Sequence, residues 1–236
     1  MFAELLGRAT TAQMVVLGIS GTLLDDEQIA VIDDIVTAMS SADPRLWPFK
    51  VTRLAASHGT APFGVAATLV AGEGGMYGSN RLLDAARWLA ALGAKANGGT
   101  LTDDEVAAEL AGAAGFGVVY RARDERFEAL VRQLERRRRE HLPFTALCLQ
   151  AARVARERIQ VEAHVYLLVA AICLDLGLQP DAIAAFGVVF LFHDSLANAV
   201  EGARQAPTVL QALPRECVEY RGRAARRSPR AAGQLV

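Results

Sequence analysis

The sequence has few cysteines, and none of them has the spacing of a metal site or a disulfide framework. Cys148, Cys173 and Cys217 lie far apart among 236 residues, and no CxxC pair occurs. A disulfide-stapled fold is therefore excluded, and reduced thiols in a cytoplasmic protein are expected. We predict no metal centre.

An excess of charge of one sign is also missing. The chain has 25 Lys and Arg against 26 Asp and Glu, which gives a formal net charge of −1 and a pI of about 6.4. This balance argues against nucleic acid or a membrane surface as the partner. The basic residues that do occur gather in the run Arg136–Arg139 and in the tail after Pro207.

Long uninterrupted hydrophobic runs are absent as well. The longest apolar stretch, VEAHVYLLVAAICLDLGL, contains Glu162, His164 and Asp175. Its uncharged part is shorter than the roughly 20 residues that a membrane span needs, so a buried core helix is predicted there. The first residues, MFAELLGRATTAQ, include a glutamate and no continuous apolar segment, and a signal peptide is not expected.

The alternation typical of strands is nearly absent, and helical periodicity takes its place. Apolar residues recur at Ile29, Ile32, Ile35 and Met39, and Thr102 with Glu105 forms a capping-box pattern. The sequence predicts an all-α fold, with helices within 20–40, 46–57, 60–75, 79–99, 101–112, 124–141, 143–159, 161–177 and 181–204. The helix over 79–99 is expected to have a Ser/Asn cap at its start and to stop at glycines.

The last two of these helices are apolar on nearly every side. Such helices are buried, so we expect the others to wrap around them. The same pattern equally suits a helix with one face covered by a second subunit.

Several segments, taken in order, resemble the citrate synthase family. GFGVVYRARDERFEAL resembles the family's loop of the form G-x-G-H-x-V-Y-x-x-x-D-P-R, and QVEAHVYLL and the helices that follow resemble its N-V-D segment. SHGTAPFGVAATLVAGEGGMYGSNRLLDAARWL is similar to the D-H-G segment and following helix of the citryl-CoA lyase module of ATP-citrate lyases. The similarity runs from about Trp47 to Gly222 and looks like the short, N-terminally reduced lyase-type members.

The resemblance implies a citrate synthase-like helical fold in a homodimer. The chain would be a single unit over 1–236, with a small-domain part at approximately 95–160 inserted into a large-domain part at approximately 1–94 and 161–236. It also implies a reaction that makes or breaks a carbon–carbon bond beside a coenzyme A thioester. The partners would be an acyl-CoA and a small carboxylic acid.

Two residues match catalytic positions of the family. Glu162 matches the aspartate of N-V-D, and otherwise it is a helix-start glutamate favoured by the helix dipole. His58 matches the histidine of D-H-G, which contacts the keto or hydroxyl oxygen of the substrate; otherwise it is a capping or core-edge histidine.

Further positions match substrate- and CoA-binding residues. Arg126 matches the D-P-R arginine that binds a carboxylate, or is a solvated arginine at a helix start. Tyr77 falls where synthases carry histidine and the lyase module phenylalanine, and Arg215 matches an arginine that reaches into the partner's site. Gly115, Phe116, Gly117 and Val118 would form the loop that faces CoA, because glycines let a backbone approach a ligand. The run Arg136–Arg139 is a solvated face or a contact for the CoA diphosphate.

Two valines set this loop apart from the family. Val118 stands where the family has histidine, and Val119 stands at a position that is often arginine; Leu191 likewise falls near a family arginine. Two hypotheses follow. The chain is an enzyme that acts on a carboxylate-bearing acyl-CoA, with the valines favouring a less polar acyl group, or it is a non-catalytic relative that binds acyl-CoA or serves as a subunit.

Overall fold

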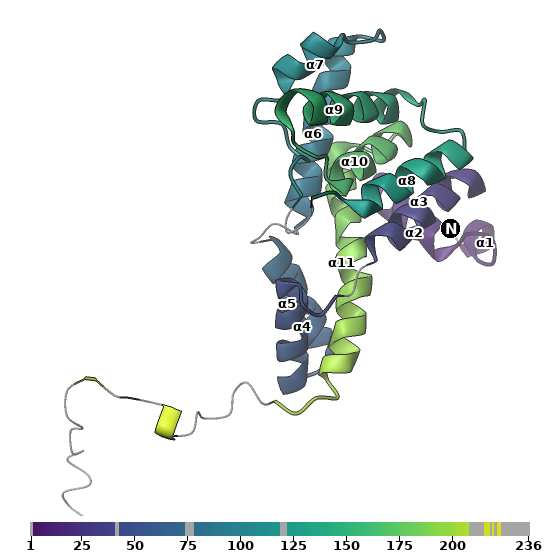
Figure 1. Cartoon of the computed structure of the whole chain (residues 1–236). Coiled ribbons are helices and arrows are strands. Elements are labelled where there is room, and N and C mark those ends of the chain that lie inside the picture. The colour runs from purple at the N-terminus through teal and green to yellow at the C-terminus, as the bar shows by residue number, and fades with distance from the viewer. Residues whose placement is uncertain are drawn as a thin grey trace, which may run out of the picture. The chain divides into compact units, whose positions relative to one another are not determined.

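The computed structural model describes residues 2–40, 43–73, 78–118, 122–207, 215–217, 219 and 221–222. The chain divides into a unit over Met1–Ala206 and a unit over Pro207–Val236. The regular elements of the described residues are helices, so the predicted all-α class is confirmed (Figure 1). The helices are α1 (Phe2–Leu5), α2 (Thr11–Ser20), α3 (Asp26–Met39), α4 (Trp47–His58), α5 (Ala61–Glu73), α6 (Ser79–Ala96), α7 (Asp103–Glu109), α8 (Glu125–Arg136), α9 (Pro143–Ile159), α10 (Val165–Asp175), α11 (Pro180–Gly202) and the short 3-10 turn η2 (Arg215–Cys217).

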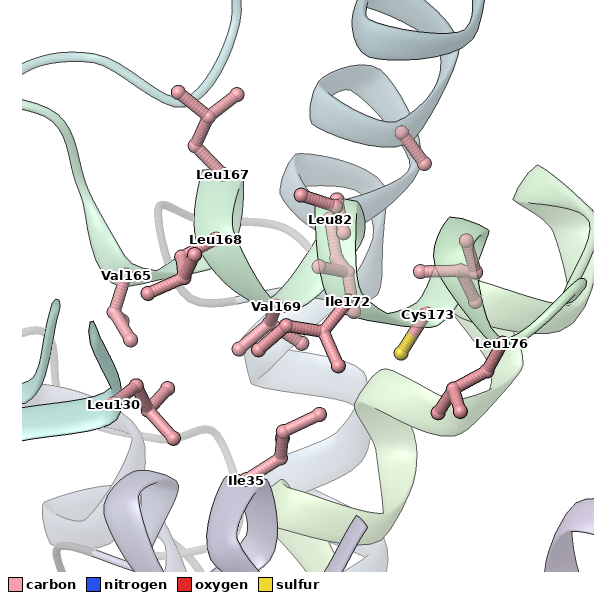
Figure 2. Close-up of a cluster of buried hydrophobic side chains, with 14 of the residues drawn as sticks. Ile35, Leu82, Leu130, Val165, Leu167, Leu168, Val169, Ile172, Cys173 and Leu176 are labelled. Atoms are coloured by element: carbon pink, nitrogen blue, oxygen red, sulfur yellow. The ribbon is translucent and has the colours of Figure 1, made fainter. Parts of the chain in front are cut away.

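Helix α10 is the centre of the core, as its sequence predicts. All side chains from Leu167 to Cys173 are buried, and α6, α8, α9 and α11 pack around the helix. Figure 2 shows Leu168, Val169 and Ile172 meeting side chains that come from other helices, among them Ile35 of α3. Each such aliphatic side chain contributes about 1.5–3 kcal/mol when it is fully buried, so this helix anchors the unit.

The observed start of α10 corrects the predicted one. The apolar pattern places the start at Val161, but the helix begins at Val165 with His164 as its N-cap. The residues before it are extended, because their backbone pairs with the loop that contains Gly115 and Gly117. This pairing brings two predicted site segments together.

Helix α11 has two different surroundings along its length. Its first half packs on α6 and the core through Ile183, Phe186 and Phe190, while its second half packs against α4 and α5 (Figure 1). The α4–α5 contact is close: a Cβ built on Gly64 would lie 2.8 Å from the Thr52 carbonyl oxygen. The second half of α11 and its two partners therefore depend on small residues at their crossings.

One side of α11 stays exposed. Four large apolar side chains recur every four residues there and are between 36% and 45% exposed; we call Val188, Phe192, Leu196 and Val200 the α11 stripe. Helix α5, which packs along α11, adds exposed Phe63 and Val70. The prediction of burial on all sides is confirmed for α10 and is wrong for α11. For α11 the alternative, a face covered by a second subunit, stays a prediction.

Helix α11 is also, within the described part of the chain, the helix whose length and composition suffice to cross a membrane. Half of its most apolar 18-residue window is buried inside the protein. It carries buried polar residues, Asp194, Ser195 and Asn198, and Arg53 of α4 donates to the side-chain oxygen Oδ1 of Asn198 at 3.3 Å. These features are those of a core helix with one apolar side.

The helix ends show which local signals were sufficient. The capping box of Thr102 and Glu105 is present at the start of α7, as predicted. Helix α2 was not predicted, although Thr10 and Gln13 form an equivalent capping box. At α6 the predicted Ser/Asn cap is wrong, because Gly78 is the N-cap and makes no side-chain cap bond.

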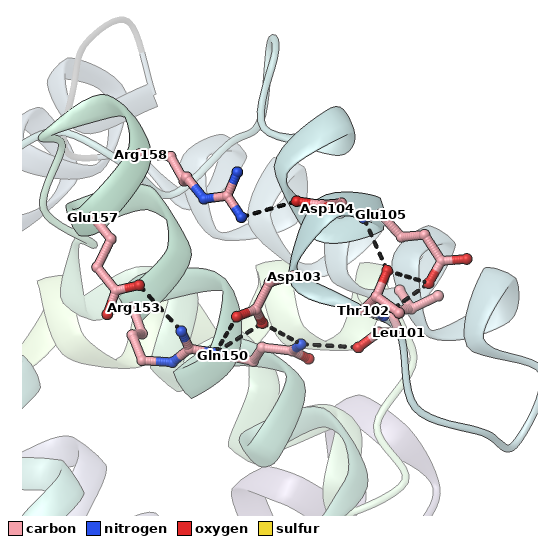
Figure 3. A network of polar contacts seen from close by, with 9 residues as sticks. All are labelled: Leu101, Thr102, Asp103, Asp104, Glu105, Gln150, Arg153, Glu157 and Arg158. Atoms are coloured by element: carbon pink, nitrogen blue, oxygen red, sulfur yellow. Dashed lines mark hydrogen bonds and ion pairs between the residues drawn. The ribbon is translucent and has the colours of Figure 1, made fainter.

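Helix α7 is held to α9 by a polar network (Figure 3). Asp103 accepts hydrogen bonds from Arg153 at 2.7 and 2.9 Å and from the Gln150 amide at 2.9 Å, and Arg158 pairs with Asp104 at 2.8 Å. The pKa of Asp103 is lowered, chiefly by the Arg153 hydrogen bonds. The network therefore holds the start of α7, the helix that precedes the glycine loop in the chain, against α9.

The second unit is described only in part. It contains η2, and Arg221 pairs with Glu219 at 2.7 Å.

Candidate active site

The glycine loop and the Glu162 segment pair through their backbones. The Gly117 amide donates to the Glu162 carbonyl oxygen and the His164 amide donates to the Gly115 carbonyl oxygen, both at 2.8 Å. Between these bonds, Phe116 and Ala163 form an antiparallel bridge. The structure therefore brings together two segments, predicted to share a site, that are more than 40 positions apart in the chain.

The two glycines of the loop have different reasons to be glycine. Both have positive φ, +88° at Gly115 and +85° at Gly117. A Cβ on Gly115 would lie 2.9 Å from the Cβ of Leu167, whereas a Cβ on Gly117 would meet no atom within 4 Å. Gly115 therefore allows close contact with the core helix, and Gly117, which is exposed, is the position where a ligand has room to approach.

Phe116 and Val118, the other predicted loop residues, lie on this same stretch. The Phe116 ring packs edge-on against Trp88 of α6, with ring centres 5.6 Å apart, so it attaches the loop to the core. Val118 is partly buried, and it is the last described residue before 119–121. Val119 lies outside the described residues.

Asp124 is the polar centre of the site, and its carboxylate is 3% exposed. Arg126 binds it in two places, with Nε 2.8 Å from Oδ1 and Nη2 2.9 Å from Oδ2. The Val165 amide, at the start of α10, donates to Oδ2 at 3.0 Å, and the Arg126 amide donates to Oδ1 at 3.2 Å. One carboxylate thus joins the first turns of α8 and α10, a position that the helix dipoles favour.

His164 completes this group, and we call Asp124, Arg126 and His164 the Asp124 cluster. The imidazole Nε2 lies 3.8 Å from Asp124 Oδ2 and 3.4 Å from Arg126 Nη2, and Nδ1 accepts from the Tyr166 amide at 3.2 Å. The imidazole is 19% exposed. Its ring also stacks edge-on with Tyr166 at 4.6 Å between centres.

Burial and charge set the protonation of the cluster. Burial would raise the pKa of Asp124, but the hydrogen bonds and charge of Arg126, the Val165 amide and nearby His164 outweigh it, and the pKa is lowered. Burial lowers the pKa of His164 to about 4; the charge of Asp124 opposes this shift, and the charges of Arg126 and Arg81 add to it. At neutral pH the cluster therefore contains a carboxylate, a guanidinium and a neutral imidazole.

Glu162 lies beside this cluster with its own arginine. Arg156 of α9 holds the carboxylate through Nε at 3.0 Å to both oxygens and Nη2 at 2.8 Å, and Arg123 lies 3.9 Å away. The Glu162 side chain is 21% exposed. A base in this position has to leave Arg156, or share it with substrate, before it can accept a proton.

The remaining predicted residues lie elsewhere or outside the described part. His58 is exposed at the end of α4, with Nδ1 3.0 Å from both the Leu54 carbonyl and the Ser57 hydroxyl, and α4 packs on α5 and α11 rather than on the loop (Figure 1). Tyr77 lies outside the described residues. Arg215 begins η2 in the second unit, but its side chain is not described.

The basic run at the end of α8 is partly a packing feature. Arg137 pairs with Asp34 of α3 at 2.6 Å, which raises the pKa of its guanidinium, and Arg138 turns the chain with a φ of +55°.

Within the described residues, no group of three or more His, Cys, Asp or Glu is placed to hold a metal ion.

Asp124 and His164 are the two site residues that the sequence motifs did not single out. Asp124 stands in the matched D-E-R stretch, two positions before Arg126, and His164 stands directly before an apolar run, which is a helix N-cap position. Both signals were local and readable. The contact between Asp124 and His164 could not be predicted from local signals, because it depends on the pairing of the loop with residues 162–164.

Comparison with known proteins bears on the fold. The structure of citryl-CoA lyase from Hydrogenobacter thermophilus superposes with a TM-score of 0.75, over 98% of this chain and 91% of that chain, at 20% sequence identity. This chain has the citryl-CoA lyase fold. The resemblance drawn from the sequence motifs is thereby confirmed as a shared citrate synthase-like architecture. No family model matches the sequence, and no curated protein matches it.

Proposed function

We propose that the chain is a citryl-CoA lyase-like enzyme, which makes or cleaves the carbon–carbon bond next to a CoA thioester of a carboxylate-bearing acyl group. The observation that carries this proposal is the joining of the glycine loop, Glu162 and Arg126 at one place of a citryl-CoA lyase fold. The fold supports the reaction class, and the side chains supply a carboxylate base and a guanidinium suited to a substrate carboxylate.

In the cleavage direction Glu162 takes the proton of the substrate hydroxyl. The carbon–carbon bond then breaks, its electron pair passes into the enolate of the acyl-CoA, and the α-carbon takes a proton back. Arg126 holds a carboxylate of the acid through charge-assisted hydrogen bonds, and the neighbouring arginines Arg123 and Arg156 add positive potential around the anionic substrate.

Cleavage of citryl-CoA by the purified chain tests this function, with oxaloacetate release followed by its coupled reduction. We expect turnover, and a loss of about 100-fold or more in Glu162→Gln, since a general base contributes that much. Glu157→Gln is the matched control, because Glu157 pairs with Arg153 on the same helix as Arg156 but outside the site. Absence of turnover with citryl-CoA, 2-methylcitryl-CoA and acetyl-CoA plus 2-oxo acids, with no CoA-ester binding by calorimetry, would contradict the proposal.

The second candidate is a relative that binds acyl-CoA without turnover, alone or as a subunit. Two observations favour it: the loop has Val118 where the family has histidine, and Arg156 holds the Glu162 carboxylate on both oxygens. It predicts CoA-ester binding without exchange of the α-protons of acetyl-CoA in deuterated water. Exchange that is lost in Glu162→Gln would exclude it in favour of the enzyme.

We further propose that two copies of the chain associate through the α11 stripe. Its four apolar side chains form a row on one side of the helix, and Phe63 and Val70 of the neighbouring α5 are exposed as well. A second copy that packs the same row against it would cover an apolar face of this kind. Sedimentation of the purified chain tests the association.

A further inference from the structure

The tautomer of His164 is set by the helix that it caps. Its Nδ1 faces the Tyr166 amide at 3.2 Å, and a backbone N–H can only donate. Nδ1 is therefore the unprotonated nitrogen, and in the neutral ring the proton is on Nε2. Protonating Nδ1 would break the cap, which is a geometric reason for the ring to stay neutral in addition to its burial.

The Nε2–H of this tautomer has no protein acceptor in the described part of the chain. Arg126 Nη2, at 3.4 Å, is itself a donor and already donates to Asp124 at 2.9 Å. Asp124 Oδ2 lies 3.8 Å from Nε2, beyond hydrogen-bond distance, and it accepts from Arg126 and the Val165 amide. A partly buried donor beside an arginine is thus left without a hydrogen-bond acceptor.

His164 lies on the same side of its segment as Glu162. In an extended segment alternate side chains point to one side, and Ala163, between the two, is buried and pairs with Phe116. Glu162 and His164 are therefore presented together, each with an arginine next to it, Arg156 and Arg126. The loop that passes over them has a valine at position 118 and no imidazole of its own between Gly115 and Val118.

We propose that His164 is a catalytic residue of this site, which donates its Nε2–H to the oxygen on which negative charge develops in the acyl substrate. This inference rests on the proposed function. A neutral imidazole stabilises such an oxygen by hydrogen bonding without giving up its proton, and Arg126 alongside binds the substrate's carboxylate.

Two variants at position 164 separate catalysis from capping. Asn accepts from an N2 amide as a good N-cap, so His164→Asn retains the start of α10 but removes the imidazole, whereas His164→Ala removes both. We expect kcat for citryl-CoA cleavage to fall about 100-fold or more in both, with KM changed far less. The melting temperature should fall by about 2–4 °C in His164→Ala and stay close to that of the original chain in His164→Asn. His141→Asn, in the exposed turn after α8, is the control and should change neither.

The results distinguish the role of His164 from the proposed function on which it rests. If the original chain cleaves citryl-CoA and His164→Asn is as fast, then His164 is only a helix cap. That result rejects the catalytic role of His164 and leaves the proposed function in place. Imidazole nitrogen NMR gives a second measurement, with acetyl-CoA and citrate as the probes. We expect a protonated Nε2 and a shift of its signal when calorimetry shows the probes bound. A protonated Nδ1, or an Nε2 signal unmoved by bound probes, overturns the inference; failure of any probe to bind, with no turnover, removes both proposals.

Discussion

The Asp124 cluster and the α11 stripe differ in whether the chain supplies their partners. In the cluster the Asp124 carboxylate is 3% exposed and has hydrogen bonds from Arg126 and two backbone amides. In the stripe, Phe192 and its three neighbours remain 36–45% exposed within the described part of the chain. A carboxylate is thus buried and paired in one region, and large apolar groups are left at the surface in the other.

The single chain therefore pairs the buried carboxylate of the Asp124 cluster, whereas it leaves the α11 stripe exposed. Burying a charged group is unfavourable unless it is paired, so the cluster can persist only because its pairing is nearly complete. An exposed apolar row is unfavourable in water, and the proposed association would cover it. Effects of substitution should therefore appear as lost folding stability in the first region and as lost association in the second.

The largest effect is expected at Asp124. Asp124→Ala removes a buried carboxylate that accepts hydrogen bonds from the Arg126 guanidinium and the Val165 amide, and the expected loss is about 3–5 kcal/mol in the free energy of unfolding, measured by urea titration. The control is Asp181→Ala, which removes an exposed carboxylate paired with Arg87. A loss at Asp124 no larger than that of the control would mean that the cluster does not stabilise the fold.

The next largest loss of stability is expected for substitutions in the glycine loop. Comparing Gly115 with Gly117 tests whether only Gly115 packs closely against the core helix. Gly115→Ala combines a φ of +88° with a Cβ 2.9 Å from that of Leu167, so about 3 kcal/mol of destabilisation is expected. Gly117→Ala has only the strain of its φ, worth about 1 kcal/mol. Thermal unfolding of both variants measures the difference. Equal losses would contradict the distinction between the two glycines.

The pH dependence of stability should report His164. Its pKa is lowered to about 4 in the fold, against roughly 6.5 in the unfolded chain. Between these values the unfolded chain binds a proton that the folded chain does not, so stability falls as the pH falls from about 6.5 to about 4, by up to about 3 kcal/mol. Urea unfolding across this range should show a shallower slope in His164→Asn. An unchanged slope would show that His164 is not buried and neutral.

The stripe is tested through association rather than stability. Replacing Phe192 and Leu196 by Glu places two like charges in each copy of the face, and we expect the dimer dissociation constant to rise about 100-fold or more, or about 2.7 kcal/mol. Sedimentation velocity measures it. Leu23→Glu is the control, because Leu23 is 52% exposed in the turn before α3 and outside the stripe. A chain that is monomeric before any substitution would remove the basis of the comparison.

Sequence patterns were sufficient where one local signal decides the structure. The apolar run of α10 predicts a buried helix, Pro143 marks the start of α9, and Thr102 with Glu105 marks the start of α7. The fold was predictable from the order of the motifs along the chain, rather than from any single motif. The start of α2 was equally predictable from the sequence, because Thr10 and Gln13 form the same kind of capping box.

The rest depended on contacts between distant segments. Helical periodicity continues back to Val161, but the backbone of Glu162 and His164 is used by Gly117 and Gly115, and so the helix starts later. The same pairing places His164 beside Asp124, which no spacing along the chain predicts. The periodicity of α11 does not reveal which of its sides stays exposed, because α4 and α5 cover only part of it.

The smallest effect is expected where a polar network resembles the Asp124 cluster but is exposed. Asp103 accepts two hydrogen bonds from Arg153 (Figure 3), as Asp124 does from Arg126. The side chains of Asp103 and Arg153, however, are 39% and 49% exposed. Water screens such a pair, so Asp103→Ala should lower the melting temperature by about 2 °C or less, and the difference from the original chain should be smaller still in about 0.5 M salt. Differential scanning calorimetry measures both. A decrease as large as that of Asp124→Ala would show that pairing, and not burial, makes the cluster important.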